Sequence, residues 1–220
     1  MFLFDSKRTF RPLRGHAQGS AANALHACAQ ASLEAGDLAA AVRTPAGTAE
    51  ADWVAVHLTD FHNAAALVFG LVVDECTAAR CPTMCATSRY EYLWSGGGGG
   101  GAPRRGSARD YVDLLLAAVA AAVDALPPPA GAPLPAAFVA GTAKPLFRRL
   151  LRVFAHVYCH HMPLIRSLAA EGHLDACMRH FHAFVVAHEL VDDKELVPLA
   201  DVLARLAAPP QLPQPQLPHA

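Results

Sequence analysis

The chain has 220 residues and a formal net charge of −1 with neutral histidines, a length that fits one domain. Its bulk charge offers no basis for binding nucleic acid or an anionic membrane. The longest apolar stretch, residues 114–123, is too short to span a bilayer. No signal peptide is visible at the N-terminus. We therefore expect a cytoplasmic, monomeric protein, with a nuclear location left open, whose six cysteines are thiols or metal ligands.

The first half of the chain predicts a basic arm followed by helices. Residues 1–20 form the arm, which carries four basic residues between 7 and 14. The segment from 23 to about 42 is compatible with a helix, and residues 52–72 predict a helix that is buried on most sides. A loop with two cysteines follows. The alternating aromatic residues at positions 90, 92 and 94 predict a short strand there.

The second half adds four more predicted helices, at 111–126, 145–168, 173–188 and 194–206. An insert at 96–106 contains six consecutive glycines and has no core-forming content. Residues 207–220 form a proline-rich tail that we expect to be disordered. Since helices dominate, we expect an all-α bundle over residues 21–206.

Two pairs of metal-ligand residues stand far apart in the chain. Cys76 and Cys81 form a Cys-x4-Cys pair, and His156 and His161 form a His-x4-His pair. Two thiolates and two imidazoles fill a tetrahedral zinc site without an open position, which predicts a structural metal site rather than a catalytic one. On an ideal helix, however, residues five apart point about 140° away from each other. Spacing alone therefore leaves His160 and His161 as alternatives, although Pro163 can end the helix near this point.

Basic side chains gather on one predicted helix. Lys144, Arg148, Arg149 and Arg152 are spaced so that the three guanidinium groups can converge on one strip of its surface. Guanidinium groups bind phosphate with two parallel hydrogen bonds. This spacing indicates a phosphate-binding site, although a charged helix face is more often simply solvated.

Several motifs resemble the Mob family of kinase activators, and especially its third type. They are KRTFRP (7–12), AQASLEAG (29–36), DWVAVHLTDF (52–61), SRYEYLW (88–94) and RVFAHVYCHH (152–161). The resemblance implies a four-helix core with flanking helices, a small β-hairpin and one structural zinc site. Carried onto this sequence, the zinc ligands are Cys76, Cys81, His156 and His161.

The resemblance also implies a non-catalytic adaptor that regulates protein kinases in Hippo-like signalling. The basic residues from Lys144 to Arg152 then bind phosphothreonine motifs of Ste20-type (Mst/Hippo) kinases. Thr9 and Ser32 match the positions that are phosphorylated in the family. An alternative is an Ndr/Lats co-activator, and a distant one is a zinc-dependent hydrolase with water as one ligand.

The co-activator alternative depends on an acidic face that receives a basic kinase segment. The resemblance places this kinase-facing surface at Glu50, Asp52, Trp53 and Asp60, although the aromatic residue fits the edge of the core equally well. Thr48 stands where activators usually carry an acid. We therefore expect weak or absent Ndr/Lats binding.

Overall fold

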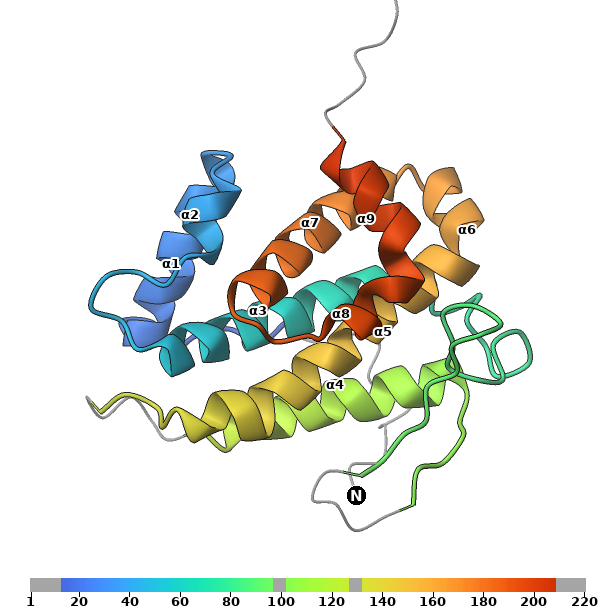
Figure 1. Ribbon diagram of the computed structural model, residues 1–220, viewed down its shortest axis with the longest axis horizontal. Helices are drawn as coiled ribbons and strands as arrows, with labels where there is room; N and C mark the ends of the chain where they lie inside the picture. The colour runs from blue at the N-terminus through green and yellow to red at the C-terminus, as the bar shows by residue number, and fades with distance from the viewer. Residues whose placement is uncertain (1–12, 97–101, 127–131, 209–220) are drawn as a thin grey trace, which may run out of the picture.

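The structure is a computed structural model that describes residues 13–96, 102–126 and 132–208. These residues are mostly helical, as the sequence predicts (Figure 1). The α-helices are α1 (Ala21–Glu34), α2 (Leu38–Val42), α3 (Glu50–Gly70), α4 (Ala108–Asp124), α5 (Lys144–His160), α6 (Met162–Ser167), α7 (Glu171–Ala187), α8 (Asp193–Leu196) and α9 (Ala200–Ala207). A short π-helix, Val139–Ala143, leads into α5, and a 3-10 turn, Val197–Leu199, joins α8 to α9.

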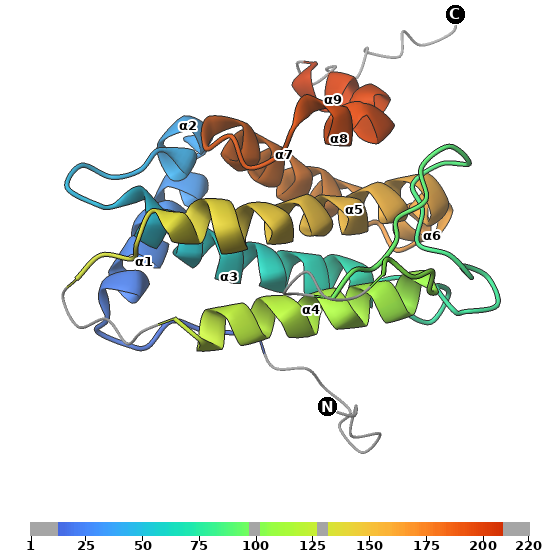
Figure 2. The same ribbon diagram turned by 60° about the horizontal axis from the view of Figure 1, so that its bottom comes forward.

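Four long helices form the core of the bundle. Figure 2 shows α3, α4 and α5 running side by side, with α7 packed beyond them and α1 and α2 at one end. An aromatic cluster ties three of these helices together. The ring of Phe61 on α3 lies 6.0 Å from Phe147 on α5 and 5.0 Å from Phe181 on α7. Burial of such rings is the main source of stability in a helical bundle.

Several helix boundaries follow from local chemistry. The side chain of Ser107 accepts a hydrogen bond from the backbone N–H of Asp110 and caps α4, and Ser20 caps α1 through Asn23 in the same way. Pro145 stands in the first turn of α5, a position that tolerates proline, directly after the π-helix. The predicted helix at 145–168 is two helices, because the chain leaves helical geometry at His161. The segment expected at 23–42 is likewise divided, into α1 and α2.

The expected β-hairpin is not confirmed. Within the described part of the segment between α3 and α4, pairing consists of two isolated antiparallel bridges, Cys85 with Glu91 and Trp94 with Arg104. Most of the predicted arm (1–12), glycine run (97–101) and tail (209–220) lies outside the described residues. Among the described helices, none is both long and apolar enough to cross a membrane.

Candidate metal centre

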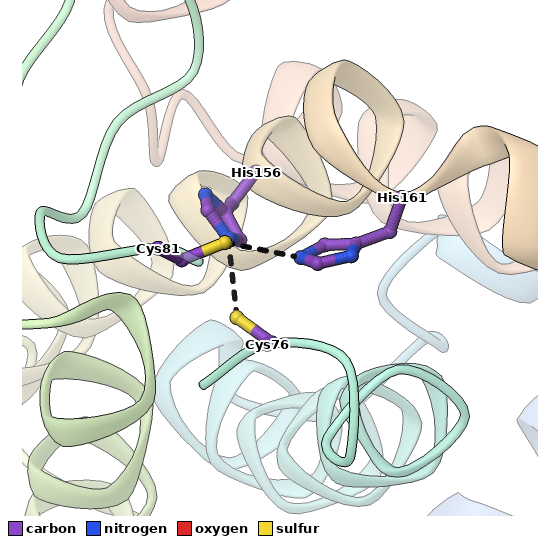
Figure 3. A group of neighbouring side chains, drawn as sticks. All are labelled: Cys76, Cys81, His156 and His161. Carbon is purple, nitrogen blue, oxygen red and sulfur yellow. Dashed lines mark hydrogen bonds between the residues drawn. The ribbon is translucent and has the colours of Figure 1, made fainter. Parts of the chain in front are cut away.

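Four side chains converge between the segment that follows α3 and the end of α5 (Figure 3). Cys76 and Cys81 come from the segment after α3, and His156 and His161 come from α5 and the residue that ends it. Their ligand atoms all lie within 4.8 Å of one another, and all four residues are buried. The structure thus brings together the four residues that the sequence predicts as ligands.

The end of α5 decides which histidine joins the cluster. The helix stops at His160, and His161 adopts φ −124° and ψ 7°, outside helical geometry. This change turns the ring of His161 toward Cys81, and its Nε2 lies 3.6 Å from the sulfur. His160 remains exposed on the helix surface. The choice between His160 and His161, open from spacing alone, is therefore made by one non-helical residue ahead of Pro163.

The distances fit a tetrahedral ion. Sγ of Cys76 lies 3.3 Å from Nε2 of His156, and Sγ of Cys81 lies 3.6 Å from Nε2 of His161. Ordinary zinc–sulfur and zinc–nitrogen bonds at a tetrahedral angle put sulfur and nitrogen about 3.6 Å apart. Nδ1 of His156 donates a hydrogen bond to the carbonyl of Cys85 at 2.8 Å, which directs the lone pair of Nε2 toward the thiols.

The electrostatics of the cluster favour a cation. Burial and the nearby Cys81 raise the pKa of Cys76 to about 12, so this thiol stays protonated at neutral pH unless a positive charge stabilises its thiolate. Burial lowers the pKa of His156 to about 4 and also lowers the pKa of His161. Imidazoles that stay neutral keep a lone pair for a metal. The group can therefore hold a metal ion, and two sulfurs with two nitrogens suit zinc.

The structure adds a pair that sequence reasoning missed. Sγ of Cys85 lies 3.3 Å from Nε2 of His160, next to the buried cluster but on the exposed side of α5. The spacing Cys81-x3-Cys85 is the signal in the sequence that could have pointed to it. Cys85 and His160 thus place a further sulfur and a further imidazole nitrogen beside the buried cluster, on its solvent-facing side.

The arginines of α5 are engaged in different contacts. The guanidinium groups of Arg148 and Arg152 both face the carboxylate of Glu195 on α8, at 3.8 and 3.3 Å. Arg148 also lies 3.6 Å from Asp192. Two of the three predicted arginines therefore meet at one anion, and that anion belongs to the chain itself.

The third arginine takes another direction. Arg149 donates to the backbone carbonyl and hydroxyl of Ser95 at 2.9 and 3.1 Å, and it lies over the ring of Trp94. Lys144 opens α5, one turn before Arg148. The three guanidinium groups share one helix, as predicted, but they do not point at one spot.

The acidic residues expected on a kinase-facing surface each contact another part of the chain. Glu50 contacts His188 at 3.0 Å, Asp52 accepts the N–H of Leu134, and Asp60 contacts two histidines near α1. At 100° of rotation per residue, Glu50 and Asp52 lie about 160° apart around α3, and Asp60 lies about 80° from each of them.

The remaining predicted site residues are Trp53, Ser32 and Thr9, and the structure describes the first two. Trp53 is 1% exposed and donates to the carbonyl of Val42 at 3.1 Å, so it belongs to the core and offers no contact surface. The hydroxyl of Ser32 bonds the carbonyl of Cys28 one turn earlier on α1. Thr9 lies outside the described residues.

Comparisons with known proteins show the family to which the chain is related. The sequence model of the Mob1/phocein family matches residues 30–199. The chain is 41% identical over 208 residues to MOB kinase activator 3A from Bos taurus, which covers 93% of this chain and 95% of the relative. It is 40% identical to MOB kinase activator-like 3 from Drosophila melanogaster, over 93% and 94% of the two chains. It is 38% identical to MOB kinase activator 3B from Homo sapiens, over 93% and 96%.

Proposed function

Because this chain belongs to the Mob1/phocein family, we propose that it is a non-catalytic, zinc-binding adaptor that regulates Ser/Thr protein kinases in Hippo-like signalling. Similarity to third-type members, expected from residues 52–61 and 152–161, is confirmed by the relatives. Their shared name supports kinases as the partners. On this proposal the protein acts as a monomer in the cytoplasm, with a nuclear role left open.

Zinc has a structural role in this proposal. The four donors would hold the ion between the segment after α3 and the end of α5, two parts of the chain that are 80 residues apart. Four protein ligands leave no position for a reacting water. The four-donor cluster therefore supports an adaptor over a zinc-dependent hydrolase, and a metal bound by three residues and water would support the hydrolase instead.

The contact of two arginines with one carboxylate is the observation that carries the phosphate-binding proposal. Arg148 and Arg152 already face an anion, the side chain of Glu195. A phosphothreonine carries up to two negative charges and three acceptor oxygens, whereas a carboxylate carries one charge and two oxygens. Phosphothreonine motifs of Ste20-type (Mst/Hippo) kinases would bind by taking the place of this carboxylate.

The Ndr/Lats co-activator alternative has less support. Its acidic residues Glu50, Asp52 and Asp60 are each occupied by contacts within the chain, and Trp53 is buried. A basic kinase segment would find no continuous acidic surface among these four residues. We place this activity second.

Calorimetry with one peptide in phosphorylated and plain forms tests the proposal. We expect only the phosphothreonine form to bind, and to bind more weakly as salt rises. Arg148→Gln, which removes the more exposed of the two arginines, should cost about 1.5–3 kcal/mol of binding free energy. Arg166→Gln is the matched control, because Arg166 is an exposed arginine on α6 that pairs with Glu171. Equal affinities for the two peptides would refute the proposal.

A further inference from the structure

A second group of metal-binding side chains lies near α1, built from elements that do not contribute to the Cys/His cluster. His16 comes from the segment before α1, His26 from α1 and Asp60 from the middle of α3. Nε2 of His16 lies 3.4 Å from the carboxylate of Asp60, and Nδ1 of His26 lies 3.0 Å from it. The three ligand atoms all lie within 4.8 Å of one another.

The cluster is only partly open to solvent. The side chains of His16 and Asp60 are 9% and 13% exposed, and that of His26 is 36% exposed. The centroids of the two imidazole rings lie 5.0 Å apart, and the ring planes are tilted by 40°. Two imidazoles and one carboxylate are a common set of ligands for divalent transition metals, and they leave coordination positions of the metal open.

The position of His16 is held in place by neighbouring helices although its segment is not helical. The side chain of Asn63 on α3 accepts the backbone N–H of Arg14 at 2.9 Å and donates to its carbonyl at 2.7 Å. The guanidinium group of Arg14 pairs with Asp124 at the end of α4. Two residues later the chain brings His16 to Asp60. A donor that is fixed before the metal arrives loses little freedom on binding.

The negative charge of the Asp60 carboxylate favours the binding of a cation. Burial by itself raises the pKa of this carboxyl, but hydrogen bonds from His16 and His26 outweigh it and bring the pKa below its usual value. The carboxylate is therefore ionised at neutral pH in a largely enclosed position. The groups that stabilise its charge are imidazoles, the nearest being His16 and His26. A divalent ion among the three atoms would neutralise the carboxylate and use a lone pair of each ring.

We propose that His16, His26 and Asp60 bind a divalent transition-metal ion, with zinc as the preferred ion, independently of the Cys/His cluster. The ion would join the segment before α1 and α1 itself to α3. Three protein ligands leave a coordination position open. His16 also lines a groove of about 860 Å³ between α1, α3 and the residues around Leu134, so the groove gives solvent access to one of the three ligands.

A cobalt titration of the metal-free full chain distinguishes the two sites. Co²⁺ bound to thiolates gives strong sulfur-to-metal charge-transfer absorption, whereas Co²⁺ bound by imidazole and carboxylate gives only weak d–d bands. We expect two equivalents, the first with the thiolate signature and the second without it. In His26→Ala and in Asp60→Asn the second equivalent should bind at least about 10-fold more weakly, because even the outer-shell partners of a metal ligand contribute that much. The first equivalent should stay unchanged.

Two controls complete the experiment. His173→Ala removes an exposed histidine on α7 and should keep both equivalents. Cys85→Ser removes the sulfur next to His160 and should leave the second equivalent intact. One equivalent in the unmutated chain would overturn the proposal and leave Asp60 as a hydrogen-bond acceptor only. A second equivalent that shows the thiolate signature, or that still binds in His26→Ala, would also overturn it. His26 is partly exposed, so His26→Ala is the milder substitution and serves as the test if Asp60→Asn fails to fold.

Discussion

Nε2 of His161 lies 3.6 Å from Sγ of Cys81, although 80 residues separate them in the chain. The contact joins the end of α5 to the segment after α3, whose described residues form turns and isolated bridges rather than a regular strand or helix. A metal at this contact would supply folding energy, since the same site is absent in the unfolded chain.

Loss of one thiolate should therefore remove both the metal and much of the stability. We expect Cys76→Ser to lose its equivalent of zinc and to lower the free energy of unfolding by about 4 kcal/mol or more, the range in which lost metal sites fall. Zinc analysis and urea unfolding measure the two effects. Cys28→Ser, an exposed cysteine on α1, should retain both. Full zinc content with unchanged unfolding in Cys76→Ser would rule out a metal at this cluster.

The two adjacent histidines should behave differently. His161→Ala should abolish zinc binding at the Cys/His cluster, because His161 is buried against Cys81. His160→Ala should retain it, since His160 is exposed and contacts Cys85 instead. Zinc content of the two variants, measured side by side, checks this. Loss of metal only in His160→Ala would reverse the assignment.

Glu195 should compete with phosphate for the arginines of α5. We expect Glu195→Gln to tighten phosphothreonine-peptide binding by about 0.5–1 kcal/mol, because the ion pair that must be broken is of that size. Calorimetry with the phosphorylated peptide measures the change. Glu171→Gln serves as the control, since Glu171 pairs with Arg166 away from these arginines. Weaker binding in Glu195→Gln would mean that Glu195 positions the arginines rather than occupying their site.

The buried carboxylate of Asp175 should make the free energy of unfolding depend on pH in the acid range. Asp175 accepts a hydrogen bond from the hydroxyl of Tyr158 at 2.8 Å and two from Arg205 at 2.7 and 2.9 Å. Burial raises the pKa of Asp175, but these hydrogen bonds outweigh it and bring the pKa below its usual value. The folded state therefore binds fewer protons than the unfolded state. The stabilisation is present in full above the unfolded pKa and is lost as pH falls through the folded pKa.

Asp175→Asn should remove this dependence. At pH 7 we expect it to lower the free energy of unfolding by about 1.5 kcal/mol, the lower end of the range for hydrogen bonds to charged groups, because Arg205 is 46% exposed. The difference from the unmutated chain should shrink as pH falls toward 3. Urea unfolding at a series of pH values measures it, with the exposed Asp193→Asn as control. A difference that is constant with pH would contradict this account.

Partner choice should depend little on one charge. We expect the unmutated chain to bind a purified Ndr/Lats N-terminal fragment weakly or not at all, and Thr48→Glu to add about 0.2–1 kcal/mol at most, the value of an exposed ion pair. Ser167→Glu adds the same charge on α6 and should change nothing. Tight binding by the unmutated chain would restore the co-activator alternative.

The sequence by itself determined what depends on neighbouring residues. The apolar density of residues 52–72 indicated a buried helix, and α3 has thirteen buried residues from Ala51 to Phe69. The Cys76–Cys81 and His156–His161 spacings indicated the metal centre, and the resemblance supplied its ligand set. The helix is confirmed, and the four Cys and His residues lie together as a group that could hold a metal ion. Local patterns carry this information because side chains a few residues apart are placed by the backbone geometry of a single helix or loop.

Only the tertiary structure decided what depends on separate elements. It turned His161 rather than His160 toward Cys81, put Glu195 against Arg152, placed Trp53 in the core and brought His16 to Asp60. None of these pairs follows from local spacing, because the meeting of distant residues is set by how helices pack and by where one residue leaves helical geometry. The free energy that holds them together comes from burial shared across the whole bundle.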